Sequence, residues 1–174
     1  MVSPLISRPE PLGPDHDVEA FRNGRHPGLD DWLRHRARAS EGLSARTYVT
    51  CRDGGDGRVV GYYALATAAA HRVALPSAKL RRAMPEDVPL ILLARLAINF
   101  EFQGRGLGRA LLADALWRCL NASEVAGIRA VIAHAIDDEA ASFYLRHGFI
   151  LASDLGERAM LLPVERLRAA VSPA

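Results

Sequence analysis

The sequence predicts a single mixed α/β domain over residues 1–174, in which helices pack on a mixed β-sheet. Three patterns carry this prediction. Residues Leu90–Ile98 form a nearly continuous apolar run, which is typical of a central strand buried on both faces. A glycine-rich loop and then an amphipathic helix follow that run. Before it, the β-rich runs 46–52 and 59–67 flank the turn Asp53–Gly57, which indicates an antiparallel hairpin.

The N-terminal part of the chain predicts short elements. Leu5–Ile6 is expected to form a first strand, and Asp15–Phe21 a short helix capped by Asp15. Residues 28–39 predict a second helix, because the apolar residues recur at helical spacing. These apolar residues are Leu29, Trp32, Leu33 and Ala37.

The C-terminal part predicts alternating strands and helices. A short basic helix is expected at 75–83 and a long amphipathic helix at 106–121. The helix 138–147 should end before Gly148, since glycine commonly follows a helix. The remaining elements are strands at 129–135, 149–152 and 160–162, and a terminal helix or tail at 163–171.

Composition places the chain among ordinary globular proteins. It is 49% hydrophobic and 24% charged, and 174 residues suffice for one core. Cys51 and Cys119 do not form the pattern of a disulfide framework or a CxxC metal site, which indicates a reduced, cytoplasmic protein. Residues Met1–Pro4 do not begin the sequence pattern of a signal peptide, and no apolar stretch is long enough to span a membrane. None of the histidines has the spacing of a metal site, so no metal is predicted.

The basic residues are almost all arginine. Of 22 basic residues, only Lys79 is lysine, while the formal net charge is +2. Arginine binds phosphate bidentately and stacks on bases, so an arginine-rich face suits a phosphorylated partner. The codon bias of a GC-rich genome is the alternative explanation.

The strongest local signal is the loop Gln103-Gly104-Arg105-Gly106-Leu107-Gly108 between a strand and a helix. The first N–H groups of a helix have no partner within it, and the helix dipole adds positive charge there. Glycines let those groups approach a ligand, so the turn suits a pyrophosphate. The spacing differs from a dinucleotide fingerprint, and no Gly-Lys-Ser/Thr of a P-loop follows. A glycine-rich connection without a ligand is the alternative.

A second motif follows the loop. The segment Asp137–Phe149 contains Ala140-Ala141, then Phe143-Tyr144, then Gly148-Phe149. Together the two motifs resemble the GNAT acyl-CoA N-acyltransferases, which implies the GNAT fold and acetyl-coenzyme A (acetyl-CoA) as cosubstrate. The resemblance implies that backbone groups of Leu96, Ala97 and Ile98 hold the acetyl carbonyl and the pantetheine arm.

The same resemblance implies further cofactor-binding residues. Asp137 stands where many relatives have Asn, and a helix cap is its alternative use. The residues implied to hold the pyrophosphate are Gln103, Gly104, Arg105, Gly106, Leu107, Gly108 and Arg109.

A narrower resemblance covers most of the chain. It rests on His16-Asp17, Leu29–Leu33, Arg46–Val49, Val60–Leu65 and Leu93–Ile98. These segments resemble the GNAT toxins of bacterial toxin–antitoxin pairs. That family acetylates the amino group of the amino acid on charged tRNA and thereby blocks translation. The resemblance further implies a ribbon-helix-helix antitoxin as partner and a homodimer.

Tyr144 is the predicted catalytic residue. In the family this tyrosine protonates or orients the leaving thiolate, and a phenol with a pKa of about 10 is ready to donate at neutral pH. A buried tyrosine without a catalytic role is the alternative. The acceptor needs no strong base, because an α-amino group has a pKa near 8.

Basic residues are the candidates for binding the acceptor. Lys79, Arg81 and Arg82 cluster on one short element and are predicted to contact tRNA phosphates, with a solvated basic face as the alternative. Arg95 interrupts an apolar strand, so its charge needs a partner. It is predicted to bind substrate, or else to pair with Glu101 or Asp137. There are two rival functions. One is a GNAT enzyme that acts on a small amine or a protein N-terminus, and the other is a binding domain without enzymatic activity.

Overall fold

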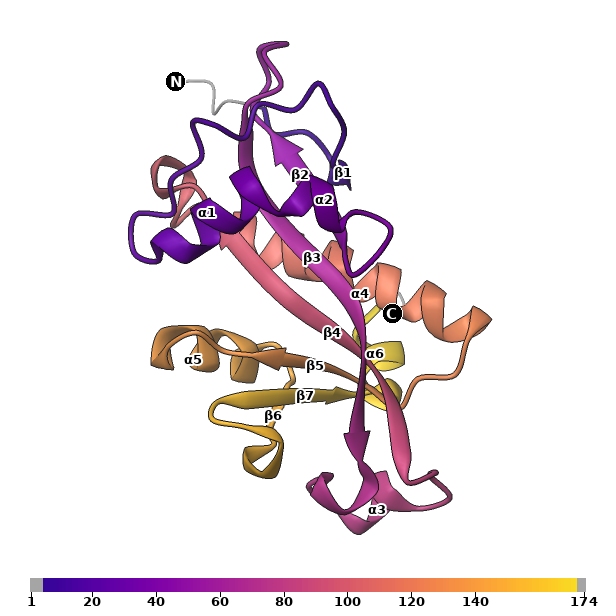
Figure 1. The fold of residues 1–174 in the computed structure, drawn as a ribbon. Helices are drawn as coiled ribbons and strands as arrows, with labels where there is room; N and C mark the ends of the chain where they lie inside the picture. Colours follow the sequence, from indigo (N-terminus) through magenta and orange to yellow (C-terminus); the bar gives the residue numbers. More distant parts are fainter. Residues whose placement is uncertain (1–4, 172–174) are drawn as a thin grey trace. The chain divides into compact units, whose positions relative to one another are not determined.

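The computed structural model describes residues 5–171 (Figure 1). Its strands form one seven-stranded sheet in the order β1-β2-β3-β4-β5-β7-β6. The strands are β1 (Glu10–Pro11), β2 (Arg46–Cys51), β3 (Val59–His71), β4 (Asp87–Ile98), β5 (Ala130–His134), β6 (Ile150–Leu151) and β7 (Ala159–Pro163). Because β4 and β5 are parallel while β5 and β7 are antiparallel, the predicted mixed α/β sheet is confirmed.

Helices connect these strands. The α-helices are α1 (Pro27–His35), α2 (Ala37–Ser40), α3 (Ala78–Arg81), α4 (Leu107–Val125), α5 (Asp138–Arg146) and α6 (Val164–Val171). Short 3₁₀ turns are η1 (Arg72–Ala74), η2 (Phe100–Phe102) and η3 (Ser153–Leu155). Among the described residues, no helix combines the length and the apolar character needed to cross a membrane.

The chain divides into two compact units. The first comprises residues 1–65 and 95–115, and the second comprises residues 66–94 and 116–174. Strands β3 and β4 and helix α4 run through both units. Each unit has a hydrophobic core of its own. The single domain over residues 1–174 stays a prediction.

The first unit is built on the β2–β3 hairpin. Arg46 pairs with Leu65 at one end of the ladder and Thr50 with Gly61 near the other, before a bulge at Cys51. Helices α1 and α2 run across this hairpin in Figure 1. Pro27 stands at the start of α1, where its fixed φ favours the helix and its missing N–H is not needed. Leu33 is fully buried and belongs to the same core as Val49 on the hairpin.

The second unit is built on β5. Residues Leu90–Leu93 of β4 pair in parallel with Ala130–Ala133, and β7 pairs antiparallel on the other side of β5. Residues Ala130–Ala133 and all of β7 are buried. This two-sided burial explains why the strands were recognisable as continuous apolar runs rather than as alternating patterns.

A buried arginine links three elements of the second unit. Arg129 precedes β5 and is only 7% exposed. Its Nε donates to the Leu80 carbonyl at 3.2 Å, and its Nη1 donates to Glu165 Oε2 on α6 at 2.9 Å. The hydrogen bond from Arg129 lowers the pKa of the Glu165 carboxyl. A charge this buried has to be paired, so α3 and α6 are both held at the start of β5.

Two N-terminal predictions are wrong. Asp15–Phe21 is not a helix, because its backbone hydrogen-bonds to the end of the connection between β2 and β3 instead. Asp17 N–H donates to the Gly57 carbonyl at 2.8 Å, and Val59 N–H donates to the Asp17 carbonyl at 2.9 Å. Leu5–Ile6 is not a strand, since Ile6 makes only an isolated bridge with Arg52. Met1–Pro4, where no signal peptide was predicted, lies outside the described residues.

Substituting Glu165→Gln should lower the free energy of unfolding by about 1 kcal/mol at pH 7, a value reduced for the partial exposure of this carboxyl. Because Arg129 lowers the pKa of folded Glu165, the contribution of the pair is full above the unfolded pKa of about 4.3 and is lost as pH falls through the folded value. Urea denaturation between pH 7 and pH 3 should therefore show the difference between the proteins shrinking. Glu157→Gln, at an exposed carboxyl, serves as control; equal losses in the two variants would contradict the role of Arg129.

Candidate active site

The end of β4 lies beyond its parallel partner. The described pairing between β4 and β5 stops at Leu93 with Ala133, whereas β4 continues to Ile98. Leu96, Ala97 and Ile98, the residues predicted to hold the acetyl and pantetheine groups, therefore lie in a segment that this ladder does not use. Ala97 is 3% and Ile98 9% exposed, so both residues pack inside the first unit.

The Ile98 carbonyl is held by two side-chain amides. Asn23 Nδ2 donates to it at 3.2 Å and Gln103 Nε2 at 3.0 Å. Gln103 Nε2 also donates to the Asn23 carbonyl at 2.9 Å. The side-chain amide of Gln103, a residue predicted to bind the cofactor, is thus engaged within the protein and fixes the start of the glycine loop against the end of β4.

The loop needs its glycines for conformation. Gly104 has φ 73° and Gly106 has φ 79°, in the left-handed region that side chains disfavour. An added Cβ would meet nothing within 4 Å at either position, so the loop surface is open. Helix α4 begins at Leu107, and the first N–H groups of a helix have no partner within it. The Arg105 guanidinium lies 5.2 Å from the Phe102 ring centroid. An open, glycine-lined helix start of this kind fits a pyrophosphate.

A buried polar pair that sequence reasoning missed supports this loop. Asn23 is 8% and Asp30 5% exposed. Asp30 Oδ1 accepts from Asn23 N–H at 2.7 Å, and Asn23 Oδ1 accepts from His26 N–H at 3.1 Å. The start of α1 is therefore tied through Asn23 to Ile98. The only sequence signal was an Asn-Gly pair shortly before a proline, which indicates a turn and no more.

Arg95 lies over an aromatic ring. Its guanidinium carbon is 4.2 Å from the Trp32 ring centroid. Trp32 stacks on Tyr62, with centroids 6.0 Å apart and rings 12° from parallel. Glu101 pairs with Arg58 instead of Arg95. Within the described part of the first unit, Arg95 contacts no carboxylate, so the ion pair with Glu101 considered as an alternative is absent there, while the pair with Asp137 stays a prediction.

One group of potential metal ligands occurs among the described residues. Glu10, His16 and Cys51 offer atoms within 4.8 Å of one another. His16 Nδ1 accepts from Gly13 N–H at 2.8 Å, which leaves the proton on Nε2 to bind Glu10 at 2.9 Å. Burial raises the pKa of Cys51 to about 11, so its thiol is protonated at neutral pH. Hydrogen bonds within the protein already use these groups.

In the second unit, Tyr144 is held on α5 with its ring buried. The residue is 7% exposed and packs against Phe143 and Phe149, with ring centroids 5.4 and 5.1 Å away. Burial raises the pKa of the Tyr144 phenol, so the hydroxyl keeps its proton at neutral pH. Within the described residues the hydroxyl has no hydrogen-bond partner, yet it is not among the fully buried unsatisfied atoms. The hydroxyl therefore carries a proton that no group in the described residues accepts.

Asp137 caps the helix that carries Tyr144. Its Oδ1 accepts from Ala140 N–H at 2.8 Å, so the capping role considered for this residue is confirmed. A cofactor contact of Asp137 stays a prediction. The neighbouring Asp138 pairs with Arg158 at 2.8 Å.

The predicted basic cluster lies on and just after α3. Ser77 caps this short helix by accepting from Leu80 N–H at 3.3 Å. Lys79, Arg81 and Arg82 are all exposed. Arg81 donates to the Leu75 carbonyl at 3.3 Å, which ties one of the three cations to the protein backbone.

Comparisons with known proteins agree with this architecture. Residues 44–151 match the family described as the acetyltransferase (GNAT) domain. The chain therefore belongs to the GNAT acetyltransferases. This places it among the enzymes, and it fits a glycine loop at the start of α4 and a tyrosine on α5.

Within that family, the chain is similar to a tRNA-acetylating toxin of Mycobacterium tuberculosis. The two are 46% identical over 144 residues, which are 82% of this chain and 84% of the relative. A solved structure of AtaT complexed with acetyl-methionyl-tRNAfMet has a TM-score of 0.87 and 29% identity, covering 96% of this chain and 99% of that one. A tyrosine-to-phenylalanine mutant of AtaT, bound to acetyl-CoA and the C-terminus of the antitoxin AtaR, has a TM-score of 0.80 and 27% identity, covering 97% and 99%.

The Gln103 hydrogen bonds can be tested by comparing two substitutions. Gln103→Ala should lower the free energy of unfolding by about 1 kcal/mol through loss of the donor. Gln103→Glu should lower it further at pH 7, because a carboxylate would face the Asn23 and Ile98 carbonyl oxygens. The excess should disappear in acid, since a protonated carboxyl has an O–H to donate. Urea denaturation at pH 7 and pH 4 measures this, and a pH-independent difference between the variants would contradict the assigned hydrogen bonds.

Proposed function

We propose that this protein transfers the acetyl group of acetyl-CoA to the α-amino group of the amino acid on charged tRNA. It would thereby block translation, as the toxin of a toxin–antitoxin pair. The observation that carries the proposal is the 46% identity to a tRNA-acetylating toxin over 82% of the chain. The structural likeness to AtaT complexed with acetyl-methionyl-tRNAfMet supports the same acceptor.

The cosubstrate would bind at the end of β4 and the start of α4. Backbone N–H groups from Gly104 to Arg109 would hold its pyrophosphate, because they begin a helix and the loop surface is open. Backbone groups of Leu96, Ala97 and Ile98 would hold the pantetheine arm and polarise the thioester carbonyl. The likeness to an AtaT structure bound to acetyl-CoA supports this use of the site.

The proposed chemistry is direct transfer. The neutral α-amine attacks the thioester carbonyl, the carbon–sulfur bond breaks, and an amide forms. The amine loses one proton to solvent, the coenzyme A thiolate takes one from the Tyr144 hydroxyl, and solvent returns a proton to the Tyr144 phenolate. Burial raises the pKa of that phenol, which keeps it protonated before the reaction. No strong base is required, because an α-amino group has a pKa near 8 and holding it against the thioester supplies most of the acceleration.

The basic residues would hold the acceptor. Lys79, Arg81 and Arg82 are exposed on or beside one short helix, and Arg95 has no carboxylate partner among the described residues. Phosphate contacts by such groups do not depend on sequence and weaken with salt. We further propose a cytoplasmic homodimer, neutralised by a ribbon-helix-helix antitoxin. An AtaT structure with the C-terminus of its antitoxin supports the existence of such a partner.

The first test is transfer of labelled acetyl from acetyl-CoA to total charged tRNA, with uncharged tRNA as control. Tyr144→Phe should reduce kcat by about 100-fold or more, because it removes the proton donor, with little change in the Kd of acetyl-CoA. Tyr48→Phe removes a phenol on β2 and is the matched control. Unchanged turnover in Tyr144→Phe would overturn the role of Tyr144. A wild-type protein that binds acetyl-CoA but labels only small amines or protein N-termini would overturn the proposed acceptor.

The basic cluster is tested by salt dependence. Each tRNA phosphate that a side chain neutralises adds about 0.7 to 0.9 to the slope of log KM for charged tRNA against log salt. Lys79→Ala and Arg82→Ala should therefore each lower that slope by about this amount. Arg166→Ala on α6, where the guanidinium donates to the Gly148 carbonyl, is the control for removal of one positive charge. Slopes that match wild type in both cluster variants would remove α3 from the RNA-binding surface.

A further inference from the structure

One buried residue, Asn23, contacts the segment that leads from β4 into the glycine loop. Its Nδ2 donates to the Ile98 carbonyl at 3.2 Å, while its own backbone carbonyl accepts from Gln103 Nε2 at 2.9 Å. Gln103 Nε2 also donates to the Ile98 carbonyl at 3.0 Å. A carbonyl oxygen has two lone pairs, and the two amides occupy both of them at Ile98. The three residues therefore form a closed set of hydrogen bonds within the first unit.

The peptide unit between Ile98 and Asn99 is consequently fixed on both sides. Its carbonyl has the two amide donors, and its N–H, which belongs to Asn99, donates to the Val60 carbonyl on β3 at 2.8 Å. Both polar groups of this peptide thus have partners within the protein. Among the backbone groups at the end of β4, the Ile98 carbonyl therefore serves the protein itself and sets the direction in which the chain leaves the strand.

The turn that carries Asn23 also packs closely on the next residue of the segment. Phe100 N–H donates to the Arg22 carbonyl at 2.8 Å. Gly24 has φ 87°, and a Cβ built there would lie 3.0 Å from the Phe100 Cβ. A side chain at this position would have to push Phe100 away, in a backbone conformation that side chains disfavour. Residues Arg22–Gly24, here called the clamp turn, are thus fitted to segment 98–103 by hydrogen bonds and by shape.

A buried carboxylate holds the clamp turn in place. Asp30 lies on α1 and is 5% exposed, and its Oδ1 accepts from Asn23 N–H at 2.7 Å. Its Oδ2 lies 3.7 Å from Arg34 Nη2, one turn further along the helix. Asn23 Oδ1 accepts from His26 N–H at 3.1 Å, immediately before the helix. A buried carboxylate needs such partners, so α1 and the clamp turn are tied together.

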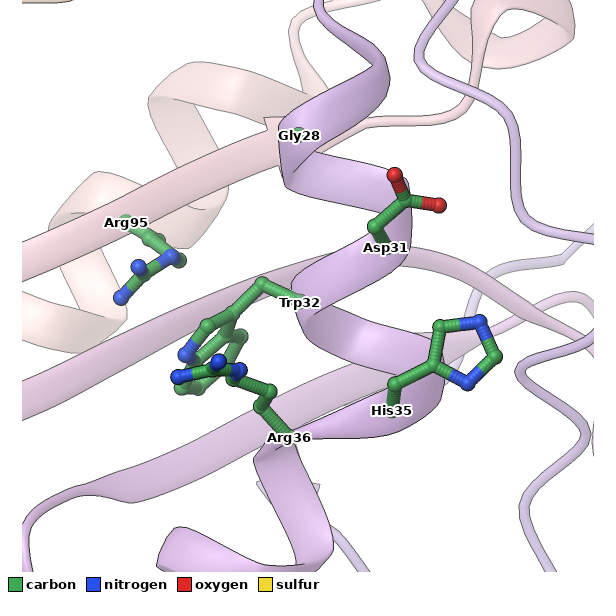
Figure 2. Close-up of a pocket in the computed structure, with 6 residues that line it drawn as sticks. All are labelled: Gly28, Asp31, Trp32, His35, Arg36 and Arg95. Atoms are coloured by element: carbon green, nitrogen blue, oxygen red, sulfur yellow. The ribbon is translucent and has the colours of Figure 1, made fainter.

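Helix α1 has two sides with different surroundings. Trp32 and Arg36 line a surface pocket, together with Arg95 of β4 (Figure 2). Asp30 is buried instead and contacts the clamp turn. The hydrogen bonds that begin at Asp30 therefore run inward, through Asn23, to the backbone at the end of β4.

We infer that Asn23 and Asp30 are positioning residues for acetyl-CoA binding, which act through the Ile98 carbonyl and the Gln103 amide. The inference rests on the part of the proposed function that places the cofactor at the end of β4 and the start of α4. The clamp turn holds these two segments in one arrangement before the cofactor binds. Without it, only a fraction of the molecules would have that arrangement, and the apparent Kd would rise by the inverse of that fraction.

The test measures the Kd of acetyl-CoA by titration calorimetry, together with steady-state kinetics. Asn23→Ala removes the donor to Ile98 and should raise both the Kd and the KM of acetyl-CoA about tenfold, while kcat at saturating cofactor changes by less than about twofold. The KM of the acceptor should stay at the wild-type value. Asp30→Ala should raise the Kd in the same way, and Asp30→Asn should restore it, because an amide oxygen still accepts from Asn23 N–H.

Thr50→Val is the matched control for loss of a buried hydrogen bond. Thr50 is buried in the first unit, and its hydroxyl donates to the Ser7 carbonyl. This variant should be less stable in urea, as Asn23→Ala should be, yet bind acetyl-CoA with the wild-type Kd. If Asn23→Ala does not fold, Asn23→Ser replaces it, since serine keeps an acceptor for His26 N–H but is too short to reach Ile98.

The outcomes separate the inference from the proposed function. A wild-type protein that binds acetyl-CoA but labels no charged tRNA would overturn the proposed acceptor, and the Kd values would still decide the inference. If Asn23→Ala and Thr50→Val bind acetyl-CoA equally well, only the inference is overturned, and the hydrogen bonds of Asn23 serve stability alone. A raised KM of the acceptor with an unchanged Kd of acetyl-CoA would overturn it as well. A wild-type protein that does not bind acetyl-CoA would overturn both.

Discussion

The candidate active site depends on one requirement. The backbone polar groups at the end of β4 need hydrogen-bond partners beyond the point where the parallel ladder with β5 stops. A buried carbonyl without a hydrogen bond is costly. The Ile98 carbonyl accepts hydrogen bonds from the side-chain amides of Asn23 and Gln103, two residues that lie outside the sheet. Because the donating groups come from the loop before α1 and the loop before α4, satisfying one carbonyl also fixes where both helices begin.

In the glycine loop, the groups that set the conformation therefore differ from the N–H groups proposed to bind the cofactor. Gly104 and Gly106 provide the left-handed turns, and Gln103 anchors the first residue of the loop by its side chain. The backbone N–H groups at the start of α4 would then be left for the proposed cofactor, because they do not have to hold the loop together. A loop whose own N–H groups made those anchoring bonds would have fewer donors left for a pyrophosphate.

Local patterns predicted most elements but not the polar contacts between them. Apolar runs predicted the buried strands β4 and β5, and helical periodicity predicted the helices α4 and α5. Both patterns arise because buried positions carry apolar residues. The role of Asn23 was not visible, since its partner Ile98 is 75 positions away in the chain. Asp15–Phe21 failed as a helix for the same reason, because its backbone bonds to Gly57 and Val59. Trp32 was assigned to a core stripe, which correctly predicts its packing on Tyr62 but not its half-exposed position beside Arg95.

The arginine content is an equally indirect guide to function. Several arginines are used to hold the protein together, by pairing with carboxylates on other elements or in the same turn. Examples are Arg34 with Asp30, Arg46 with Glu41, Arg52 with Asp56, Arg58 with Glu101, Arg129 with Glu165 and Arg158 with Asp138.

Under the proposed function, binding of a polyanion would come from cations that the fold leaves without a carboxylate, such as Arg36 and Arg95. A net charge of +2 gives little long-range attraction, so local geometry has to supply the affinity. Arg36 and Arg95 meet that condition together, because they flank one fixed indole and repel each other in the absence of an anion. A bound phosphate would take the place of the carboxylate partner that each of these two arginines lacks.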